Sequence, residues 1–268
     1  MTDHASTRAR PCLSHGNEGQ GRHARGRLGF ILLDTEETAD DDIRAMVPWD
    51  VGVFITRVRL ADPVTVQNLT AVAGDLGDAA RLLPERLDAI AYVCTSGSIA
   101  AGEAAVERAI RSAQPETSPL ALVTCVVDAM RHLGIARVAV GTPYLDEVNR
   151  MEAAFLEDRG FDVSSMRGLG IARGRDMTRV EPRDIVRLAL DVCTSNCDGI
   201  FLSCTALRAV EVIETIEDET GKPVVTSNQA LVWRMLRQIG IHDSTSGPGR
   251  LFRLPEPVQP AVDMPRAR

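Results

Sequence analysis

The sequence predicts an α/β protein made of two similar halves, each with a parallel sheet, that face each other across a cleft. Short apolar runs alternate with amphipathic segments, which is typical of parallel sheets with right-handed crossovers. A pattern of strand, cysteine and helix occurs twice, around Cys94 and Cys204. An apolar strand also starts 67 residues before each cysteine, at Arg27 and at Arg137. This equal spacing indicates two halves related by a pseudo-twofold axis.

The individual elements follow from hydrophobic periodicity, with short buried runs predicting strands and longer periodic segments predicting helices. The aspartates at 40–42 suit the positive end of a helix dipole, and Pro182 after Glu181 marks another helix start. Strands are expected at 29–33, 51–58, 90–93, 137–140, 161–165, 200–202 and 223–225. Helices are expected at 40–46, 63–83, 99–110, 145–159, 182–190, 206–216 and from 226 to 236. The segment 117–133, a strand or a helix, links the halves.

We expect residues 27–120 plus 226–255 to form the first α/β domain and residues 121–225 the second. Residues 1–26 are rich in Arg, His, Gly and Ser and carry a net charge of +2. They lack the apolar middle of a secretory signal, so a disordered extension is predicted, with an over-extended start site as the alternative. Residues 256–268 are predicted to be a disordered tail.

Composition argues against several classes of partner. The net charge of −7 disfavours nucleic acid and anionic membranes, which attract basic surfaces. No apolar stretch approaches the roughly 20 residues of a membrane span. Aromatic content is only 4%, so the core must rest on aliphatic side chains. We expect no nucleic-acid or membrane partner, and the sequence leaves a homo-oligomer open.

The six cysteines show no disulfide framework, which fits a reducing cytoplasm. Cys193 and Cys197 lie four residues apart on a predicted helix, but no second ligand pair accompanies them, so no metal is expected. We interpret them as buried or surface thiols.

Cys94 and Cys204 are the candidate catalytic residues. A thiol at a helix N-terminus can have a lowered pKa, and the N–H groups there can bind a carboxylate. We expect the turns at Thr95–Ser96 and Thr205–Ala206 to cradle such a group and to stabilise the charge that develops beside it. One thiol could then remove a proton and the other return one, or one thiolate could add to a double bond.

Other interpretations of these residues remain open. A strand-end cysteine is usually core packing, although two at symmetric positions favour function. The histidines lie in the N-terminal segment or near helix ends, so a Cys-His or Ser-His-Asp mechanism has little support. Tyr144 could hold a carboxylate oxygen or pack as a cap. Asn228 and Gln229 could contact substrate or cap the helix that follows them.

Five short motifs carry a family resemblance. They are Cys-Thr-Ser-Gly-Ser at 94–98, Thr-Pro-Tyr at 142–144 with Asn149, Ser-Cys-Thr at 203–205, Pro-Val-Val-Thr-Ser-Asn-Gln-Ala at 223–230 and Gly-Arg-Leu at 249–251. As a set covering about 27–253, they resemble one branch of the aspartate/glutamate racemase superfamily. This branch holds maleate cis–trans isomerases, arylmalonate decarboxylases and ectoine-utilisation proteins.

The resemblance implies two Rossmann-like domains with the active site between them and no metal or organic cofactor. Cys94 and Cys204 match the paired catalytic cysteines of the isomerases and racemases. Thr95, Ser96 and Tyr144 match residues that bind a carboxylate or enediolate. Decarboxylases of this branch generally have glycine at the position of Cys94, so the presence of both thiols favours an isomerase or racemase.

The chain also departs from the family pattern. Maleate isomerases carry Pro-Ser-Ser-Asn-Thr after the first strand, whereas residues 33–37 here read Leu-Asp-Thr-Glu-Glu. A second asparagine of the family falls at Gly174. Glu36 would repel a second carboxylate and suit an ammonium or amidinium group, and the Asp-Thr-acid pattern looks most like the ectoine-utilisation proteins. The alternative is that the acids at 34–42 form a solvated cluster at a helix start.

These observations predict a cofactor-independent isomerase or racemase acting on a small carboxylate, amino-acid-like and ectoine-derived at its most specific. The alternatives are an arylmalonate-type decarboxylase that uses Cys204 and a non-catalytic protein that binds a small molecule. The expected substrate-binding residues are Thr95, Ser96, Tyr144, Thr205, Ala206, Glu36 and Asn228.

Overall fold

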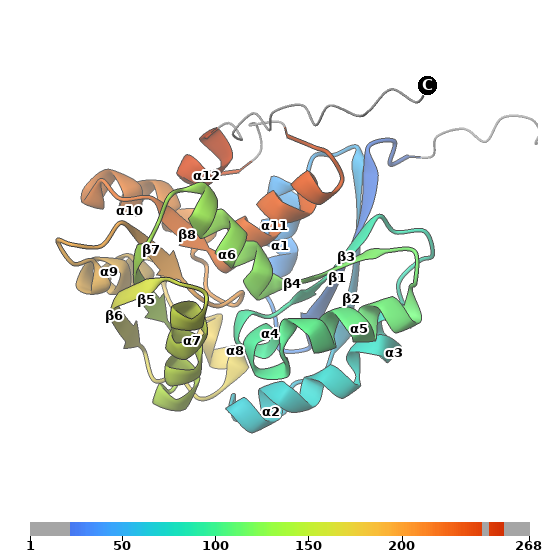
Figure 1. Cartoon of the computed structure of the whole chain (residues 1–268), viewed down its shortest axis with the longest axis horizontal. Coiled ribbons are helices and arrows are strands. Elements are labelled where there is room, and N and C mark those ends of the chain that lie inside the picture. The colour runs from blue at the N-terminus through green and yellow to red at the C-terminus, as the bar shows by residue number, and fades with distance from the viewer. Residues whose placement is uncertain (1–21, 243–246, 255–268) are drawn as a thin grey trace, which may run out of the picture.

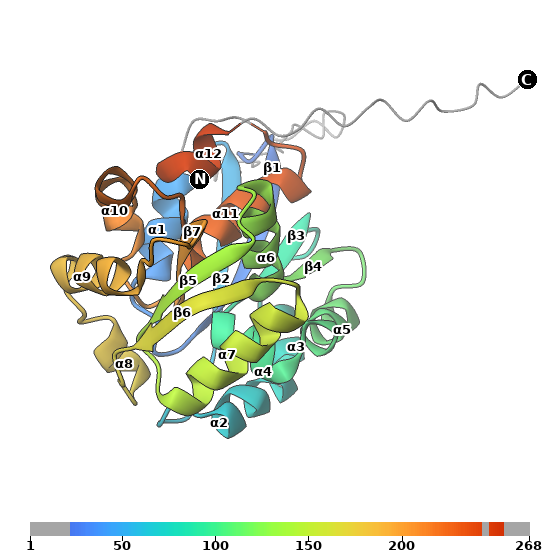
Figure 2. The ribbon, with the colours of Figure 1, turned by 60° about the vertical axis from the view of Figure 1, so that its left-hand side comes forward.

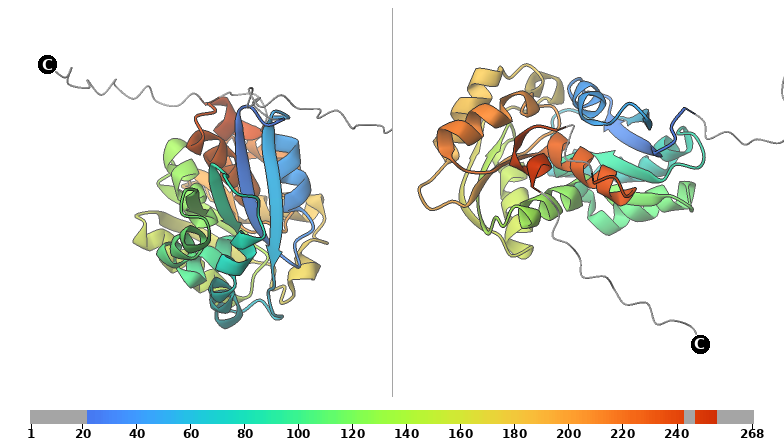
Figure 3. Two further views of the ribbon diagram at one scale, coloured as in Figure 1. Left: turned by 90° about the vertical axis from the view of Figure 1, so that its right-hand side faces the viewer. Right: turned by 90° about the horizontal axis from the view of Figure 1, so that it is seen from above.

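A computed structural model describes residues 22–242 and 247–254 and contains two four-stranded parallel sheets, which confirms the predicted fold class. The strands are β1 (Gly26–Leu33), β2 (Val51–Val58), β3 (Ala89–Val93), β4 (Ser118–Ala121), β5 (Arg137–Thr142), β6 (Asp162–Gly168), β7 (Gly199–Leu202) and β8 (Val224–Thr226). Their orders, β2-β1-β3-β4 and β6-β5-β7-β8, are the same in both halves. Figure 1 shows the two sheets side by side, and the right panel of Figure 3 shows them in separate lobes.

The strand sequences explain why two of the four strands in each sheet are central. All five residues of β3 and all four of β7 are buried, as expected for strands covered on both faces. The register repeats as well, because Leu28 of β1 pairs with Ala89 and Val138 of β5 pairs with Gly199. Each cysteine therefore follows the central strand next to the first strand of its half.

The helices cover the sheets and join the halves. They are α1 (Ala39–Met46), α2 (Val66–Ala71), α3 (Leu76–Arg81), α4 (Thr95–Ala101), α5 (Glu103–Ala113), α6 (Leu122–His132), α7 (Asp146–Asp158), α8 (Gly174–Met177), α9 (Pro182–Val192), α10 (Ile213–Thr220), α11 (Ser227–Gln238) and α12 (Gly249–Arg253), with 3₁₀ turns η1 (Val72–Gly74) and η2 (Val210–Val212). Helix α11 follows β8 but also packs on β3, and α6 follows β4 but also packs on β8. These two helices pack against each other between the sheets (Figure 1).

Several expected elements differ in detail. The segment 117–133 holds both a strand and a helix, β4 and α6. The expected helix at 99–110 is divided into α4 and α5 at Gly102, which has a φ of +81° that glycine adopts without strain. The predicted helix at 206–216 is wrong at its start, because a turn and η2 precede α10. Cys193 and Cys197 do not share a helix, since Cys193 is the C-cap of α9 and Cys197 lies in the loop beyond it.

The ends of the chain bear on the predicted boundaries. β1 begins at Gly26, so the predicted extension overlaps the first strand by one residue. Residues 1–21 and the predicted tail at 256–268 lie outside the described residues. Within the described part of the chain, no helix combines the length and apolarity that crossing a membrane requires.

Candidate active site

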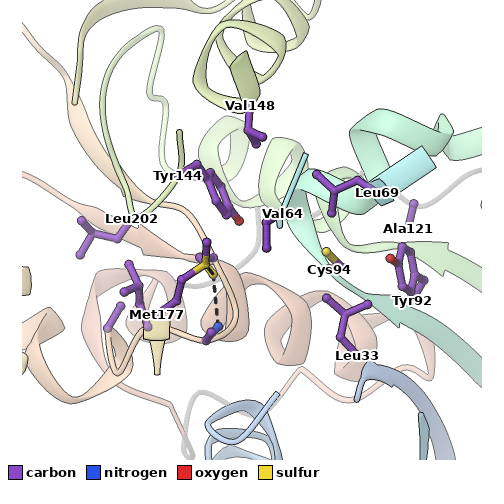
Figure 4. Packing of buried hydrophobic residues seen from close by; sticks show 14 of the residues in the cluster. Leu33, Val64, Leu69, Tyr92, Cys94, Ala121, Tyr144, Val148, Met177 and Leu202 are labelled. Carbon is purple, nitrogen blue, oxygen red and sulfur yellow. Dashed lines mark hydrogen bonds between the residues drawn. The ribbon is translucent and has the colours of Figure 1, made fainter. Parts of the chain in front are cut away.

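A narrow cavity lies at the carboxyl ends of the strands and is lined by both halves, with both candidate cysteines in its wall. Cys94, Ser96, Tyr144, Cys204, Thr205, Ala206 and Glu36 line it together with Leu33, Thr35, Leu60, Val64, Leu69, Gly174 and Met177. Figure 4 shows Cys94, Tyr144 and Met177 around this space. Its volume is only about 20 Å³.

Cys94 is the N-cap of α4, which begins at Thr95 and therefore earlier than the expected helix start at 99. Its Sγ accepts a hydrogen bond from the N–H of Gly97 at 3.2 Å, and the Ser96 hydroxyl lies 3.8 Å from the sulfur. Its carbonyl oxygen accepts a hydrogen bond from Ser98 Oγ at 2.6 Å. The thiol is held by the first turn of its own helix, with 4% of the residue exposed.

Cys204 is held by an irregular turn rather than by a helix. Its φ is +110°, a conformation that costs of the order of 1–3 kcal/mol and occurs often at functional sites. The N–H of Ala206 donates to Cys204 Sγ at 3.4 Å, and the thiol lies 3.9 Å from Met177 Sδ. The expected symmetry between the two thiols therefore holds for their place after a strand and fails for the segment that follows.

The expectation of lowered thiol pKa values is wrong for this structure. Burial raises the pKa of Cys94, and the Gly97 N–H and the Ser96 and Tyr92 hydroxyls offset only part of that effect. Burial also raises the pKa of Cys204 strongly, with a further contribution from the Glu36 carboxylate. Both side chains are therefore protonated thiols near neutral pH, which suits proton donation.

Tyr144 brings a hydroxyl to the same space. The residue is 3% exposed, and burial raises the pKa of its phenol well above the usual range. The hydroxyl interacts with Ser96 and with the Cys204 thiol. The turn beneath it is fixed by Thr142, whose Oγ1 accepts from the N–H of Tyr144 at 3.1 Å and donates to Asn149 Oδ1 at 2.5 Å. Tyr144 therefore reaches both halves of the cavity as a neutral hydrogen-bond donor.

Glu36 lies in the cavity wall with 4% of the residue exposed, so the alternative of a solvated acid cluster is wrong for this residue. Its Oε1 accepts from the N–H groups of Thr38 and Ala39 at 2.9 and 3.1 Å, at the start of α1. Its Oε2 accepts from Thr205 Oγ1 at 2.6 Å. Glu36 thus caps a helix of the first half and holds the Cys204 turn of the second.

Two of the expected substrate-binding residues, Thr95 and Asn228, lie outside the cavity lining. Thr95 Oγ1 is 2.7 Å from the hydroxyl of Ser227, which also accepts from the N–H of Cys204 at 3.0 Å. Asn228 Nδ2 donates to the carbonyl of Thr205 at 2.9 Å and to Asp42 Oδ2 at 2.7 Å. In this structure both side chains support the cysteine turns, and their contact with substrate stays a prediction.

The apolar wall is the part of the site that sequence reasoning missed. It consists of Leu33, Leu60, Val64, Leu69 and Met177. Each looks in the sequence like an ordinary core residue, so no local signal distinguishes it. Glu36 is the only charged residue in the described lining.

The glycine at the position of the family's second asparagine also has a structural reason. A Cβ on Gly174 would lie 2.8 Å from Thr35 Oγ1, which is closer than real contacts allow. Thr35 therefore occupies part of the space that an asparagine side chain at 174 would need. The two departures noted in the sequence, at 33–37 and at 174, meet at one point of the cavity wall.

Gly97 provides a test of the packing around Cys94. A Cβ there would lie 2.4 Å from Tyr92 Oη and 2.9 Å from Cys94 Sγ. We expect Gly97→Ala to lower the free energy of unfolding by about 1–3 kcal/mol because these buried atoms must move apart. Equilibrium unfolding in urea measures the change. Gly74→Ala, where nothing lies within 4 Å of the added Cβ, is the matched control, and equal effects of the two substitutions would contradict the argument.

Among the described residues, no group of three or more His, Cys, Asp or Glu side chains is arranged to hold a metal ion. Cys193 and Cys197 approach each other, with 3.9 Å between their sulfurs, but no third ligand joins them within 22–242 and 247–254.

The fold and the paired thiols define an α/β scaffold whose candidate site lies between two pseudo-symmetric halves. The arylmalonate decarboxylase family profile matches residues 54–252. Arylmalonate decarboxylase of Bordetella bronchiseptica is 35% identical over 196 residues, covering 70% of this chain and 81% of that protein. Maleate isomerase of Nocardia farcinica is 25% identical over 246 residues, covering 85% and 95%. The chain belongs to the arylmalonate decarboxylase family.

Solved structures agree with this assignment. The structure of unliganded arylmalonate decarboxylase has 30% sequence identity and a TM-score of 0.70, covering 85% of this chain and 98% of that one. The maleate isomerase of Pseudomonas putida S16, in a cysteine-to-alanine variant with maleate, has a TM-score of 0.76 at 22% identity, covering 85% and 97%. The second likeness shows a shared fold alone.

Proposed function

We propose that this protein is an isomerase of the racemase type that moves a proton between the two faces of a small carboxylate. The observation that carries the proposal is that one cavity is lined by two thiols, Cys94 and Cys204, one from each half. Because burial raises both thiol pKa values, one cysteine must first lose its proton to solvent. The resulting thiolate takes the proton from the carbon beside the carboxylate and leaves an enediolate. The opposite thiol donates a proton to the other face, so the two cysteines exchange protonation states.

Two hydroxyl groups support the binding of the carboxylate and the enediolate. Those of Ser96 and Tyr144 line the cavity, whereas the Thr205 hydroxyl already donates its proton to Glu36. The first N–H groups of α4 also have no partner within the helix. Hydrogen bonds to an enediolate strengthen as negative charge develops on its oxygens. These groups therefore favour the intermediate over the bound carboxylate.

The cavity wall favours a substrate with one carboxylate and an apolar substituent. Val64, Leu69 and Met177 can pack against an alkyl or aryl group, whereas Glu36 would repel a second carboxylate. An amino-acid-like substrate derived from ectoine depends on Glu36 as the partner of an ammonium group. Both Glu36 oxygens already accept hydrogen bonds, so this narrower substrate has less support than an apolar one.

Decarboxylation of a substituted malonate is the second candidate, supported by the 35% identical decarboxylase and by the apolar wall. A carboxylate placed against such a wall is poorly solvated, and loss of CO₂ relieves this while leaving the electron pair in an enediolate. The Cys204 thiol would protonate the enediolate carbon and recover a proton from solvent. The raised thiol pKa values suit this acid role.

Proton NMR in D₂O over a panel of aryl- and alkylmalonates, 2-substituted monocarboxylates, maleate, aspartate and ring-opened ectoine tests both candidates. Deuterium exchange beside the carboxylate, lost in both Cys94→Ala and Cys204→Ala, supports racemisation. Loss of CO₂ from a malonate, retained in Cys94→Ala, supports the decarboxylase instead. No change in any compound would favour a protein that binds a small molecule without catalysis.

A further inference from the structure

Helix α7 carries a buried carboxyl group that the proposed reaction does not use. Glu152 has 0% exposure, and neither of its oxygens has a hydrogen-bond partner among the described residues. Burial raises its pKa from 4.5 to about 7, and interaction with the Ser203 hydroxyl offsets part of the effect. Burying a carboxyl group without hydrogen bonds costs free energy, so Glu152 requires an explanation in the local structure or in the chemistry.

Ser203, the neighbour of Glu152, directly precedes Cys204. Its side chain is also fully buried, and its Oγ has no hydrogen-bond partner among the described residues. The equivalent position of the first half, before Cys94, is the apolar Val93. A hydroxyl is therefore present only on the side where a carboxyl group faces it, and this pair adjoins the turn with a φ of +110°.

The other half has a carboxyl group at the equivalent position. The 110 residues that separate Cys94 from Cys204 also separate Asp42 from Glu152. Asp42 is held by Asn228, which in turn binds the carbonyl of Thr205. Two buried acids thus flank the 203–205 turn, one reaching it through an amide and the other through a hydroxyl.

The surroundings leave few other charges to act on Glu152. Helices α4 and α2, which pack against α7, contain no ionisable residue. The other charged residues of α7 and those of the adjacent β6 are all exposed, and Arg167 of β6 pairs with Asp191. The titratable groups on the inner side are Tyr144, whose phenol senses the Glu152 charge, and beyond it Cys204, Cys94 and Glu36, whose charge acts on both thiols. Figure 2 shows α7 next to α4 and α2.

We infer that Glu152 is a positioning residue for Cys204, which supports the 203–205 turn through Ser203 and in its ionised form suppresses thiolate formation at Cys204. This inference rests on the proposed function only in taking Cys204 as a reactive thiol. A neutral carboxyl adds no charge that would oppose formation of the enediolate. An ionised one interacts with the Ser203 hydroxyl and adds a negative charge that acts on Tyr144, the neighbour of Cys204, which raises the cost of forming a second anion there.

Site-resolved alkylation of the full-length protein by iodoacetamide, read by peptide mass spectrometry, tests the inference without any substrate. At pH 8.5 we expect Cys204 in Glu152→Gln to react up to about tenfold faster than in the wild type, which is the effect of lowering the thiol pKa by roughly one unit. At pH 6, where Glu152 is protonated, the two rates should agree within about twofold. The reactivity of Cys94 serves as the internal reference.

Two further variants separate this role from a merely structural one. Ser203→Ala keeps the carboxyl group but removes the neighbour that stabilises its charge, so the break in the pH profile near 7 should move to higher pH. Asp42→Asn, the matched change in the other half, should leave that break in place. Equal Cys204 rates in the wild type and Glu152→Gln at pH 8.5, or an equal rise at Cys94, would overturn the inference.

If Glu152→Gln does not fold, carbon NMR of glutamate-labelled wild type still decides the case. A side-chain carboxyl titrating near pH 7 supports the inference, and titration of every glutamate below pH 5.5 overturns it. A pH break in alkylation without turnover of any compound would leave the inference standing while the proposed function fails. Turnover of a compound without that pH break would support the proposed function and overturn the inference.

Discussion

Cys204→Ala is expected to lower kcat/KM on any accepted substrate by about two to four orders of magnitude, the usual loss when a positioned proton donor is removed. Cys204 is the acid or base in both candidate reactions, and its sulfur is held in the cavity by the Ala206 N–H. Cys204→Ser should lose nearly as much activity, because a hydroxyl is a far weaker acid than a thiol. Steady-state kinetics on the first active compound of the panel measures the effect.

The companion change at Cys94 separates the two reactions. A racemase needs a thiol on each face, so Cys94→Gly should abolish exchange to the same extent as Cys204→Ala. A decarboxylase that protonates from Cys204 alone should keep most of its rate.

Cys125→Ala is the control for both substitutions. Cys125 is buried in α6, burial raises the pKa of its thiol to about 12, and it lies outside the cavity lining. Its loss should lower stability slightly and leave kcat/KM nearly unchanged. Full activity in Cys204→Ala would refute a catalytic role for that thiol in either reaction.

The free energy of unfolding is expected to fall as pH rises from about 5 to 8, and Glu152 is expected to cause most of the change. Its pKa is about 7 in the folded protein against a usual value of 4.5, so between these values the folded state keeps a proton that the unfolded chain has released. The stabilisation is complete below the unfolded pKa and is lost as pH passes through the folded one. A pKa shift of this size changes the free energy of unfolding by at most about 3 kcal/mol.

Urea unfolding of the wild type and Glu152→Gln at several pH values measures this term. The variant should be the more stable protein at pH 8 and should show a much flatter profile. Asp42, whose pKa burial raises from 3.8 to about 6, should add a smaller decline at lower pH, which Asp42→Asn removes. Parallel profiles for the wild type and Glu152→Gln would show that Glu152 does not carry the pH dependence.

The local pattern of the chain was enough to predict the sheets and the pair of thiols. Strand prediction succeeded at β3 and β7, because buried parallel strands are short, apolar and bounded by polar turns. The start of the helix after Cys204 was predicted wrongly, since the apolar spacing there serves a turn and η2 before α10 begins and packs on β8. Apolar periodicity reports burial, and burial alone does not distinguish these backbones.

The electrostatic predictions failed for a related reason. The lowered thiol pKa values were argued from a helix N-terminus, whereas burial of Cys94 and Cys204 outweighs the local hydrogen bonds. For the same reason Glu36 was wrongly interpreted as a solvated acid, and Glu152 was not recognised as a buried one. Desolvation depends on what the rest of the chain places around a group, and that information is not local.

The chain alone specifies two halves of equal spacing, a thiol after the central strand of each, and the hydroxyl groups beside them, because these depend on residue type and short-range periodicity. Only the tertiary structure decides which side chains share the cavity. It brings Leu60, Val64 and Leu69 from one half against Met177 of the other, and places Ser227 between Thr95 and Cys204. These contacts join residues far apart in sequence, and their energies depend on burial and distance, which only the packed halves define.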